Sequence, residues 1–180
     1  MHQRGFSLVE LLMGLTIGGI VLHLVSPAFA AVVESNYREE AAKSLASGMR
    51  IARSEAISRG QTVVIHGVNG DWSQGWRIIL DLSGKGHEDD SNPLLIERRS
   101  GIALPVFGNR NVRTSVRFGR LGELVGGGFQ AGTLHVCATR EPLSLHQVVL
   151  APNGRVSLNK KKIEQALCVG GEDSEQGADA

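Results

Sequence analysis

The longest predominantly apolar stretch of the chain lies near its start, from Leu11 to Val33. A helix rises about 1.5 Å per residue, so this stretch is long enough to cross the hydrocarbon core of a bilayer, which is about 30 Å thick. One acidic residue, Glu10, stands at its N-terminal end. A carboxylate in a membrane span costs roughly 2.5 to 3.5 kcal/mol on insertion scales, so we expect Glu10 to have a partner.

The helical pattern continues from residue 34 to Gly60 with a different distribution of side chains. Apolar residues recur at spacings of three and four, which places them on one face of an otherwise charged helix: Ala42, Leu45, Met49, Ala52 and Ala56. Gly60 is a natural C-terminal stop. We predict that residues 34–60 form the amphipathic half of a long N-terminal helix and that its apolar stripe packs on a sheet.

Beyond Gly60 the pattern changes to short apolar or alternating runs separated by Gly, Pro and Asn, which predict strands. Asn69-Gly70 predicts a tight hairpin turn between the first two runs. The predicted strands cover residues 61–67, 76–82, 94–97, 112–118, 132–138, 147–150 and 156–158. The expected fold is therefore α+β, with a long N-terminal helix packed on an antiparallel β-sheet domain over residues 61–169.

The composition agrees with one small domain. Of the 180 residues, the first 30 or so belong to the apolar segment, and the remainder is enough for a single core. Aromatic residues make up only 4% of the chain and glycine is abundant, with 23 residues, which favours short strands and tight turns. Residues 170–180 are acidic and begin with two glycines, so we expect a disordered tail.

Only five residues precede Phe6, and one of them is basic. An ordinary secretory signal has a longer charged region, a shorter apolar run and a cleavage site after that run. The segment Arg4-Gly5-Phe6-Ser7-Leu8-Val9-Glu10 instead resembles the class III leader of type IV pilins and pseudopilins. The resemblance implies that residues 1–5 are a leader, that a prepilin peptidase cleaves between Gly5 and Phe6, and that it methylates the new amine of Phe6.

The same resemblance assigns two tasks to residues 6–33. They would first anchor the chain in the inner membrane, with the globular domain in the periplasm, and would later form a helix in the core of a fibre at the cell surface. In the fibre, Glu10 would pair with the N-terminal amine of a neighbouring subunit. The implied partners are therefore the peptidase, the inner membrane and other pilins.

A second set of motifs lies in the β region. In order, the chain contains Asp71-Trp72-Ser73-Gln74-Gly75-Trp76, then Leu94-Leu95-Ile96-Glu97-Arg98, Val116-Arg117-Phe118, Gly132-Thr133-Leu134-His135-Val136-Cys137 and Asn153-Gly154-Arg155-Val156. Each motif alone is weakly specific. Together with the leader they resemble the GspH/FimT family of minor pilins and pseudopilins, over roughly residues 4–168.

Charge is segregated along the chain. Residues 98–162 contain eleven Lys or Arg against two acids, although the whole chain carries a formal net charge of only +1. The balancing acids lie in residues 163–180, which contain no Lys or Arg. Such segregation favours an anionic partner for the basic part, and each phosphate neutralised would add to affinity and to salt dependence.

Two groups of residues are candidates for binding DNA. Arg113 and Arg117 alternate with apolar residues, as on an outward strand face that contacts either solvent or an anion. The better candidates are Gly154, Arg155, Lys160, Lys161 and Lys162. FimT-like minor pilins of DNA-uptake systems have a Gly-Arg-x-Arg element here that contacts DNA, whereas this chain has Ser157 in place of the second Arg. Without aromatic residues in this stretch, binding would be to phosphate and independent of sequence.

The two cysteines, Cys137 and Cys168, flank the basic stretch. A metal pair or a catalytic nucleophile is an alternative, but a domain outside the cytoplasm meets oxidising conditions, which favour a disulfide. Closing a loop of about 30 residues would contribute roughly 3 to 4 kcal/mol in the chain-entropy model. Paired cysteines near the C-terminus also fit the resemblance to FimT- and FimU-like pilins.

Other chemistry is weakly supported. Residues 81–90 have the acidic appearance of a calcium loop, but Lys85 and Asn92 stand where an EF-hand requires ligands. His66, His87, His135 and His146 lack metal-binding spacing. We therefore predict no enzyme, no metal and no cofactor.

Two functions remain open. The first is a minor pilin of a type IV pilus that binds DNA non-specifically during uptake, as in natural transformation. The second is a purely structural subunit that primes or caps a type IV pilus or a type II secretion pseudopilus.

Overall fold

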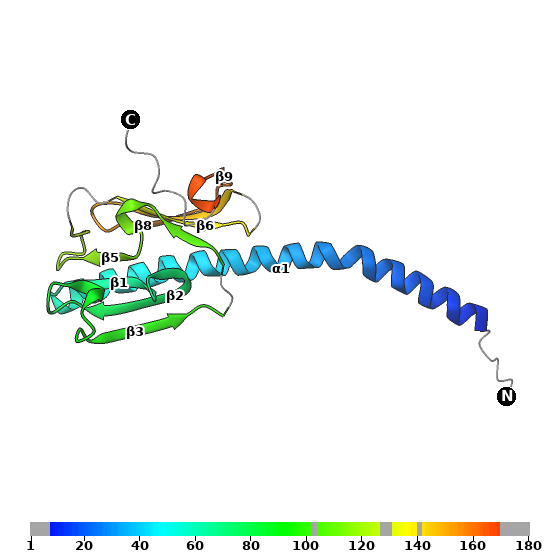
Figure 1. Cartoon of the computed structure of the whole chain (residues 1–180), viewed down its shortest axis with the longest axis horizontal. Helices are drawn as coiled ribbons and strands as arrows, with labels where there is room; N and C mark the ends of the chain where they lie inside the picture. The colour runs from blue at the N-terminus through cyan, green and yellow to red at the C-terminus, as the bar shows by residue number, and fades with distance from the viewer. Residues whose placement is uncertain (1–7, 102–103, 127–130, 140–141, 170–180) are drawn as a thin grey trace. The chain divides into compact units, whose positions relative to one another are not determined.

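The computed structural model describes residues 8–101, 104–126, 131–139 and 142–169. These residues form one long helix, α1 (Leu8–Arg59), followed by nine strands and three short 3-10 helices (Figure 1). The chain divides into two compact units, residues 1–37 and 38–180. The predicted leader, residues 1–5, and the predicted tail, residues 170–180, lie outside the described residues.

The first unit contains the N-terminal half of α1. Large apolar side chains are exposed from Leu8 to Val32, and an added Cβ at Gly14, Gly18 or Gly19 would meet no atom within 4 Å. Within the described residues, no helix combines the length and apolar character needed to cross a membrane. The membrane span over residues 11–33 stays a prediction.

The C-terminal end of α1 is a Schellman motif. Gly60 adopts a left-handed conformation with φ of 61°. Its N–H donates to the carbonyl of Ile57 at 3.3 Å, and the N–H of Gln61 donates to that of Ala56 at 3.3 Å. Glycine is favoured here because it has no Cβ to clash in this conformation. The predicted helix stop is confirmed.

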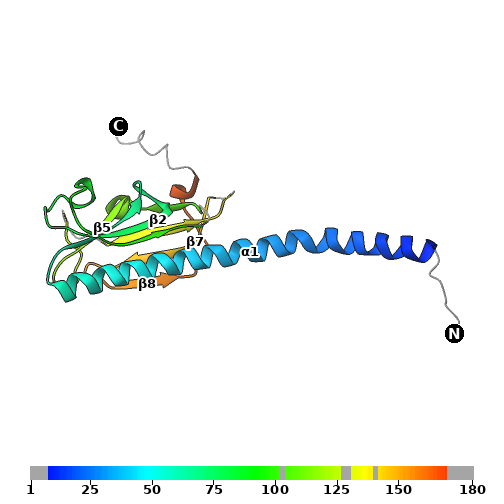
Figure 2. The same ribbon diagram turned by 90° about the horizontal axis from the view of Figure 1, so that it is seen from below.

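The second half of α1 runs alongside the strands of its own unit (Figure 2). Every residue of the predicted stripe is buried: Ala42, Leu45, Met49, Ala52 and Ala56. At Gly48 an added Cβ would lie 2.8 Å from the ring of Trp76, so this face of the helix is in direct contact with a strand. The indole N–H of Trp76 donates to the hydroxyl of Ser44 at 3.2 Å. The stripe therefore packs on a sheet, as predicted.

The first sheet has four antiparallel strands in the order β3-β2-β1-β5. They are β1 (Val63–Val68), β2 (Asp71–Leu80), β3 (Leu94–Arg99) and β5 (Ser115–Phe118). Asn69 and Gly70, which join β1 to β2, have φ of 54° and 78°. Two positive φ angles are the signature of a type I′ turn, which matches the twist of a hairpin. The predicted hairpin is confirmed.

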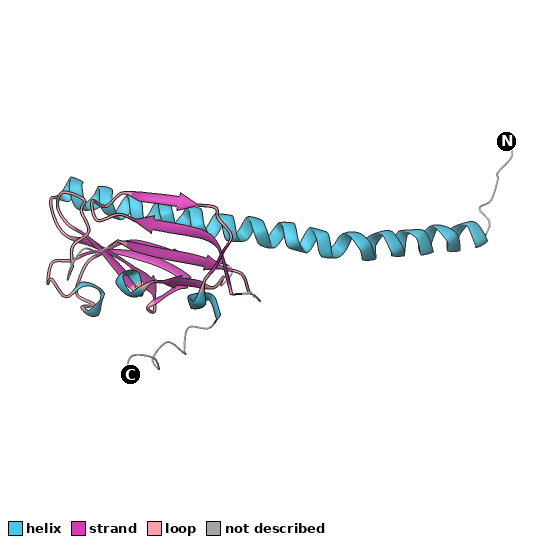
Figure 3. Cartoon of the chain, turned by 90° about the horizontal axis from the view of Figure 1, so that it is seen from above, coloured by secondary structure: helices cyan, strands magenta, loops and turns pink. Residues whose placement is uncertain are grey.

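The second sheet contains β4 (Val106–Gly108), β6 (Gly132–Cys137), β7 (Leu143–Leu150) and β8 (Val156–Asn159) in that order, with β9 (Ile163–Glu164) paired to β7. All pairings are antiparallel. Figure 3 shows the strands gathered beside the helix. Sequence patterns missed β4 and β9, because two or three residues are too few to show a period.

One core unites the helix and both sheets. Its largest fully buried side chains include Phe118 of β5, Met49 of α1 and Leu134 of β6. Along β6 and β7 the residues facing this core are Leu134, Val136, Val148 and Leu150, which leaves the intervening residues on the outer face. The predicted fold, a long helix on an antiparallel β domain, is confirmed, with two sheets rather than one.

The strand predicted over residues 112–118 is wrong in its first part. A 3-10 helix, η2 (Arg110–Val112), replaces it, and β5 begins only at Ser115. The bend directs the carbonyls of Val112 and Arg113 to the indole N–H of Trp72, at 3.1 and 2.9 Å. A buried indole needs an acceptor, and a regular strand would use these carbonyls elsewhere.

A disulfide joins Cys137, at the end of β6, to Cys168 in the 3-10 helix η3 (Ala166–Val169), with Cα atoms 5.5 Å apart. The predicted disulfide is confirmed, and it excludes a metal pair or a free nucleophile at these cysteines. It ties the segment after β9 to the second sheet.

Candidate functional site

The four cations Arg155, Lys160, Lys161 and Lys162, here called the basic edge, lie on either side of β8. All four residues are exposed. Among the described residues, no ion pair engages Arg155, Lys161 or Lys162. The second sheet thus presents exposed cations at both ends of β8, the strand that pairs with β7.

Helix α1 holds the start of β8 in place. The guanidinium of Arg53 donates to the carbonyl of Gly122 at 2.9 Å and to that of Asn153 at 3.2 Å. The N–H of Gly154 donates to the carbonyl of Ala151 at 2.8 Å, which closes the turn before Arg155. Charged donors form strong hydrogen bonds, so the turn that carries Arg155 is anchored to the helix.

Gly154 has a packing role. Its φ is 75°, and an added Cβ would lie 1.7 Å from the carbonyl oxygen of Gly122. No other residue fits where two backbones approach so closely. The structure therefore explains this glycine without a ligand, and direct contact between Gly154 and DNA stays a prediction.

Lys160 differs from the other cations of the basic edge. Its ammonium is 2.5 Å from the carboxylate of Glu39 on α1, which also pairs with Lys43 at 2.7 Å. These two hydrogen bonds, with Lys160 the stronger influence, lower the pKa of Glu39 to about 2. Lys160 is thus partly neutralised by Glu39 and is less available to an anionic ligand. The sequence pattern did not indicate this ion pair.

His146 of β7 lies beside this ion pair. It is only 9% exposed, and its Nδ1 has no hydrogen-bond partner among the described residues. Burial lowers its pKa, Lys160, Arg38 and Lys43 lower it further, and only Glu39 opposes them. His146 is therefore neutral in the folded chain at neutral pH.

We expect His146→Leu to weaken the pH dependence of stability. In the unfolded chain a histidine binds a proton below about pH 6.5, whereas the pKa of His146 in the folded chain is lower. The unfolded state therefore binds more protons as the pH falls, and acid favours unfolding. Wild-type stability should fall from pH 7 to pH 5, and the variant should lose less over that range while remaining at least as stable at pH 7. Urea midpoints at both pH values measure this. Equal losses in the two proteins would contradict it.

The other two predicted DNA contacts lie away from β8. Arg113 is exposed but belongs to the bend after η2, and Arg117 is in β5 of the first sheet. The guanidinium of Arg117 pairs with the buried carboxylate of Asp81 at 3.1 Å and donates to the carbonyl of Gly84 at 3.1 Å. This geometry gives Arg117 a structural partner and does not join it to the basic edge.

The loop with a calcium-like sequence is closed by its own hydrogen bonds. Asp81 accepts from the N–H of Gly86 at 2.9 Å, at the start of the 3-10 helix η1 (Gly86–Glu88), and Asn92 donates to the carbonyl of Gly86 at 2.8 Å. Hydrogen bonds from Ser91 lower the pKa of Asp89 to about 2. Across the described ranges, no group of three potential metal ligands gathers.

A groove lies on the outer face of the second sheet, next to the basic edge. Its volume is about 820 Å³. It is lined by Thr133, His135, Gln147, Val149, Leu158, Asn159, Lys160, Lys161 and Ile163. Sequence analysis missed this groove, although the alternation of polar residues with core residues along β6 was a signal for it.

Hydrogen bonds hold the floor and one wall of the groove. Nδ1 of His135 lies 3.0 Å from the hydroxyl of Ser144, and its Nε2 lies 3.3 Å from the amide nitrogen of Gln165. Gln147 donates to the hydroxyl of Ser144 and to the carbonyl of Lys161, both at 2.8 Å. Burial lowers the pKa of His135, so the floor is neutral and the charge of the groove comes from its lysines.

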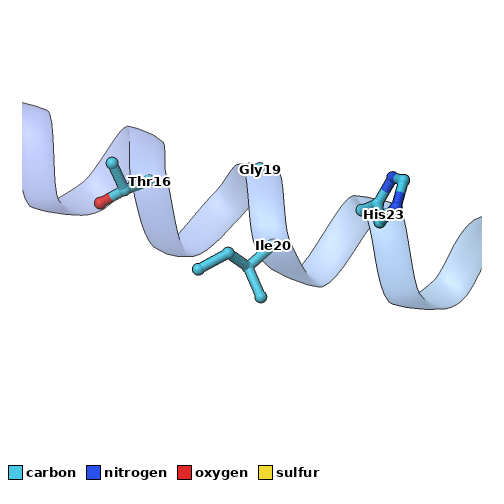
Figure 4. A pocket seen from close by; sticks show the side chains of 4 residues that line it. All are labelled: Thr16, Gly19, Ile20 and His23. Carbon is cyan, nitrogen blue, oxygen red and sulfur yellow. The ribbon is translucent and has the colours of Figure 1, made fainter.

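A second, smaller hollow lies on the N-terminal half of α1. Thr16, Gly19, Ile20 and His23 line about 470 Å³ along one side of the helix (Figure 4). Glu10 is exposed in the first turn of α1, and the predicted cleavage site at Gly5 and Phe6 lies outside the described residues. The processing role of Gly5 and Phe6 and the fibre-assembly role of Glu10 stay predictions.

Two family models match parts of this chain. Residues 41–154 match the family model described as type II transport protein GspH, and residues 1–26 match the prokaryotic N-terminal methylation motif. No curated protein matches the chain.

Two crystal structures of the type IV minor pilin FimU from Pseudomonas aeruginosa share the fold. One has a TM-score of 0.58 at 22% identity and covers 73% of this chain and 96% of its own. The other has a TM-score of 0.56 at 22% identity and covers 71% and 98%. Since the GspH model also spans more than half of the chain, the chain belongs to the GspH family, and it has the fold of a type IV minor pilin.

Proposed function

We propose that this protein is a minor pilin of a type IV pilus that binds DNA non-specifically through the basic edge during DNA uptake. The observation that carries the proposal is the exposure of Arg155, Lys161 and Lys162 beside β8, without ion pairs to any described residue. Solvated cations on one edge are available to phosphates, whereas cations already paired within the fold are not.

The chemistry of the basic edge supports contact with phosphate rather than reading of sequence. Lysine ammonium groups and an arginine guanidinium bind phosphate oxygens, which are the same at every base pair. Affinity should therefore fall steeply with salt, since counterions are released on binding. The family and the fold are those of structural subunits, and we propose no catalytic role.

Processing and assembly complete the proposal. The match to the N-terminal methylation motif supports cleavage between Gly5 and Phe6 by a prepilin peptidase, followed by methylation of Phe6. The subunit would wait in the inner membrane with its domain in the periplasm, and would then join other pilins in the fibre through Glu10 and the helix. The exposed apolar side chains from Leu8 to Val32 are suited to packing against neighbouring helices.

The second candidate function is structural. The same apolar surface of α1 would suffice for a subunit that primes or caps a fibre through protein contacts alone. The family description names type II transport, so a secretion pseudopilus is the alternative machine.

Replacement of Arg155, Lys161 and Lys162 by alanine distinguishes the two functions in cells. We expect transformation to fall about a hundredfold with pili intact, because each phosphate contact contributes several-fold to affinity at physiological salt. Lys85→Ala, an exposed lysine in the loop between β2 and β3, is the control. Loss of pili from the triple variant would favour the structural function, as would normal transformation.

A further inference from the structure

A row of four side chains crosses the whole second sheet, and three of them line the groove. His135 of β6 is directly opposite Gln147 of β7, and Gln147 is directly opposite Asn159 of β8. On the other side, His135 is opposite Phe107 of β4. Directly opposed residues of antiparallel strands share a face, so an aromatic ring, an imidazole and two carboxamides lie in line on the outer face.

The middle of this row is buried although it lies outside the core. His135 is 5% exposed and Gln147 is 4% exposed, and both are in contact with the segment after β8, through Gln165 and the carbonyl of Lys161. That segment is fixed by the disulfide, by the contact of Gln165 with His135 and by the bond from Gln147 to the carbonyl of Lys161. The groove is therefore preformed.

The lining combines three kinds of chemistry. Val149 and Ile163 supply apolar surface, the exposed carboxamide of Asn159 can pair with polar edges, and Lys160 and Lys161 add positive charge. The buried carboxamide of Gln147 keeps its N–H groups on Ser144 and Lys161 and so shapes the floor. Carboxamides pair with base edges, and unstacked bases bind on aromatic and apolar side chains. A volume of about 820 Å³ lies in the range of small-molecule sites, which is roughly 300 to 1,000 Å³.

We propose that this groove is a subsite for an unpaired base of single-stranded DNA whose phosphates lie on the basic edge. The inference rests on the proposed DNA binding and adds to it a preference for single-stranded over duplex DNA. The bases of a duplex are stacked inside the helix, so a duplex contacts only the cations of the basic edge, through its phosphates. A single strand can also place a base in the groove. The single strand is therefore the better ligand.

The test is fluorescence anisotropy with a labelled 15-nucleotide single strand and the duplex of the same sequence. The protein is the full chain in non-ionic detergent, as wild type and as Val149→Phe, which fills the groove without changing charge. Leu94→Phe, on exposed β3 of the first sheet, is the matched control. Asn159→Ala removes one exposed carboxamide of the row without adding bulk.

We expect the wild type to bind the single strand about tenfold more tightly than the duplex, because a base in the groove buries apolar surface on Val149 and Ile163. Val149→Phe should remove this preference and leave duplex binding unchanged, Asn159→Ala should reduce it, and Leu94→Phe should keep it. Equal affinity of the wild type for both DNAs, or an unchanged preference in Val149→Phe, would overturn the inference while leaving the basic edge as a DNA site. Absence of binding to either DNA would instead refute the proposed function.

Discussion

Replacing Gly154 with alanine is expected to lower the free energy of unfolding by about 3 kcal/mol. Its φ of 75° is a left-handed conformation that costs an ordinary residue about 1 to 2 kcal/mol. The new Cβ would also lie 1.7 Å from the carbonyl oxygen of Gly122, so one of the two turns must move, and overpacking of this kind costs about 1 to 3 kcal/mol. Urea unfolding of the full chain in detergent, followed by tryptophan fluorescence, measures the loss.

Gly60→Ala is the matched control for this prediction. Gly60 has a similar φ of 61°, but an added Cβ there would meet no atom within 4 Å. It should therefore show the conformational cost alone, about 1 to 2 kcal/mol. A loss at Gly154 no greater than the loss at Gly60 would mean that the approach of the two turns is not constrained, and would contradict the packing role assigned to Gly154.

Removing the disulfide is expected to have an effect of similar size. The double variant Cys137→Ser, Cys168→Ser should lose about 3 to 4 kcal/mol, because an open loop of about 30 residues gains conformational entropy in the unfolded chain. Wild-type protein with a reductant should match the variant in urea unfolding, and the variant itself should be insensitive to reductant.

The location of the disulfide predicts that its removal lowers stability without changing the environment of the tryptophans in the native state. It ties η3 to the end of β6, beside the groove, and lies away from the packing of α1 on the first sheet. The tryptophan signal of the native state should therefore survive reduction. A variant as stable as the wild type would contradict the account, since the segment from Lys160 to Val169 would then be held by its hydrogen bonds alone.

The large elements of the fold could be predicted because their signals are local. The stripe at Ala42, Met49 and Ala56 follows the period of a helix, Gly60 ends it, and Asn69-Gly70 makes a type I′ turn with no contribution from distant residues. Each of these features depends on a few neighbouring residues. The disulfide was predictable because the chain has two cysteines and its domain was expected outside the cytoplasm, where conditions are oxidising.

Features that depend on distant contacts could not be predicted in the same way. The bend of η2 exists because Trp72, forty residues earlier, needs an acceptor. Arg117 looks like a free outward cation in the sequence, yet its partner Asp81 lies in a loop of the same sheet. Gly154 resembles part of a ligand motif, and only the approach of Gly122 shows its packing role.

The candidate site was predicted in part. The cations of the basic edge are exposed as the sequence indicated, but the pairing of Lys160 with Glu39 and the groove beside it arise from the way β8 lies next to α1 and β7. His135, Gln147 and Asn159 form one row only because three strands pair in a particular register. The sequence of any one strand does not indicate that register.

The measurement that tests the central claim most directly is the binding of labelled duplex DNA to the full chain in detergent at two salt concentrations. It should be made on oxidised protein, beside the variant with Arg155, Lys160, Lys161 and Lys162 replaced by alanine. We predict binding that weakens steeply with salt and that the variant loses, since phosphate contacts release counterions. Failure of the wild type to bind at low salt, or equal binding by the variant, would contradict the claim that the basic edge binds DNA.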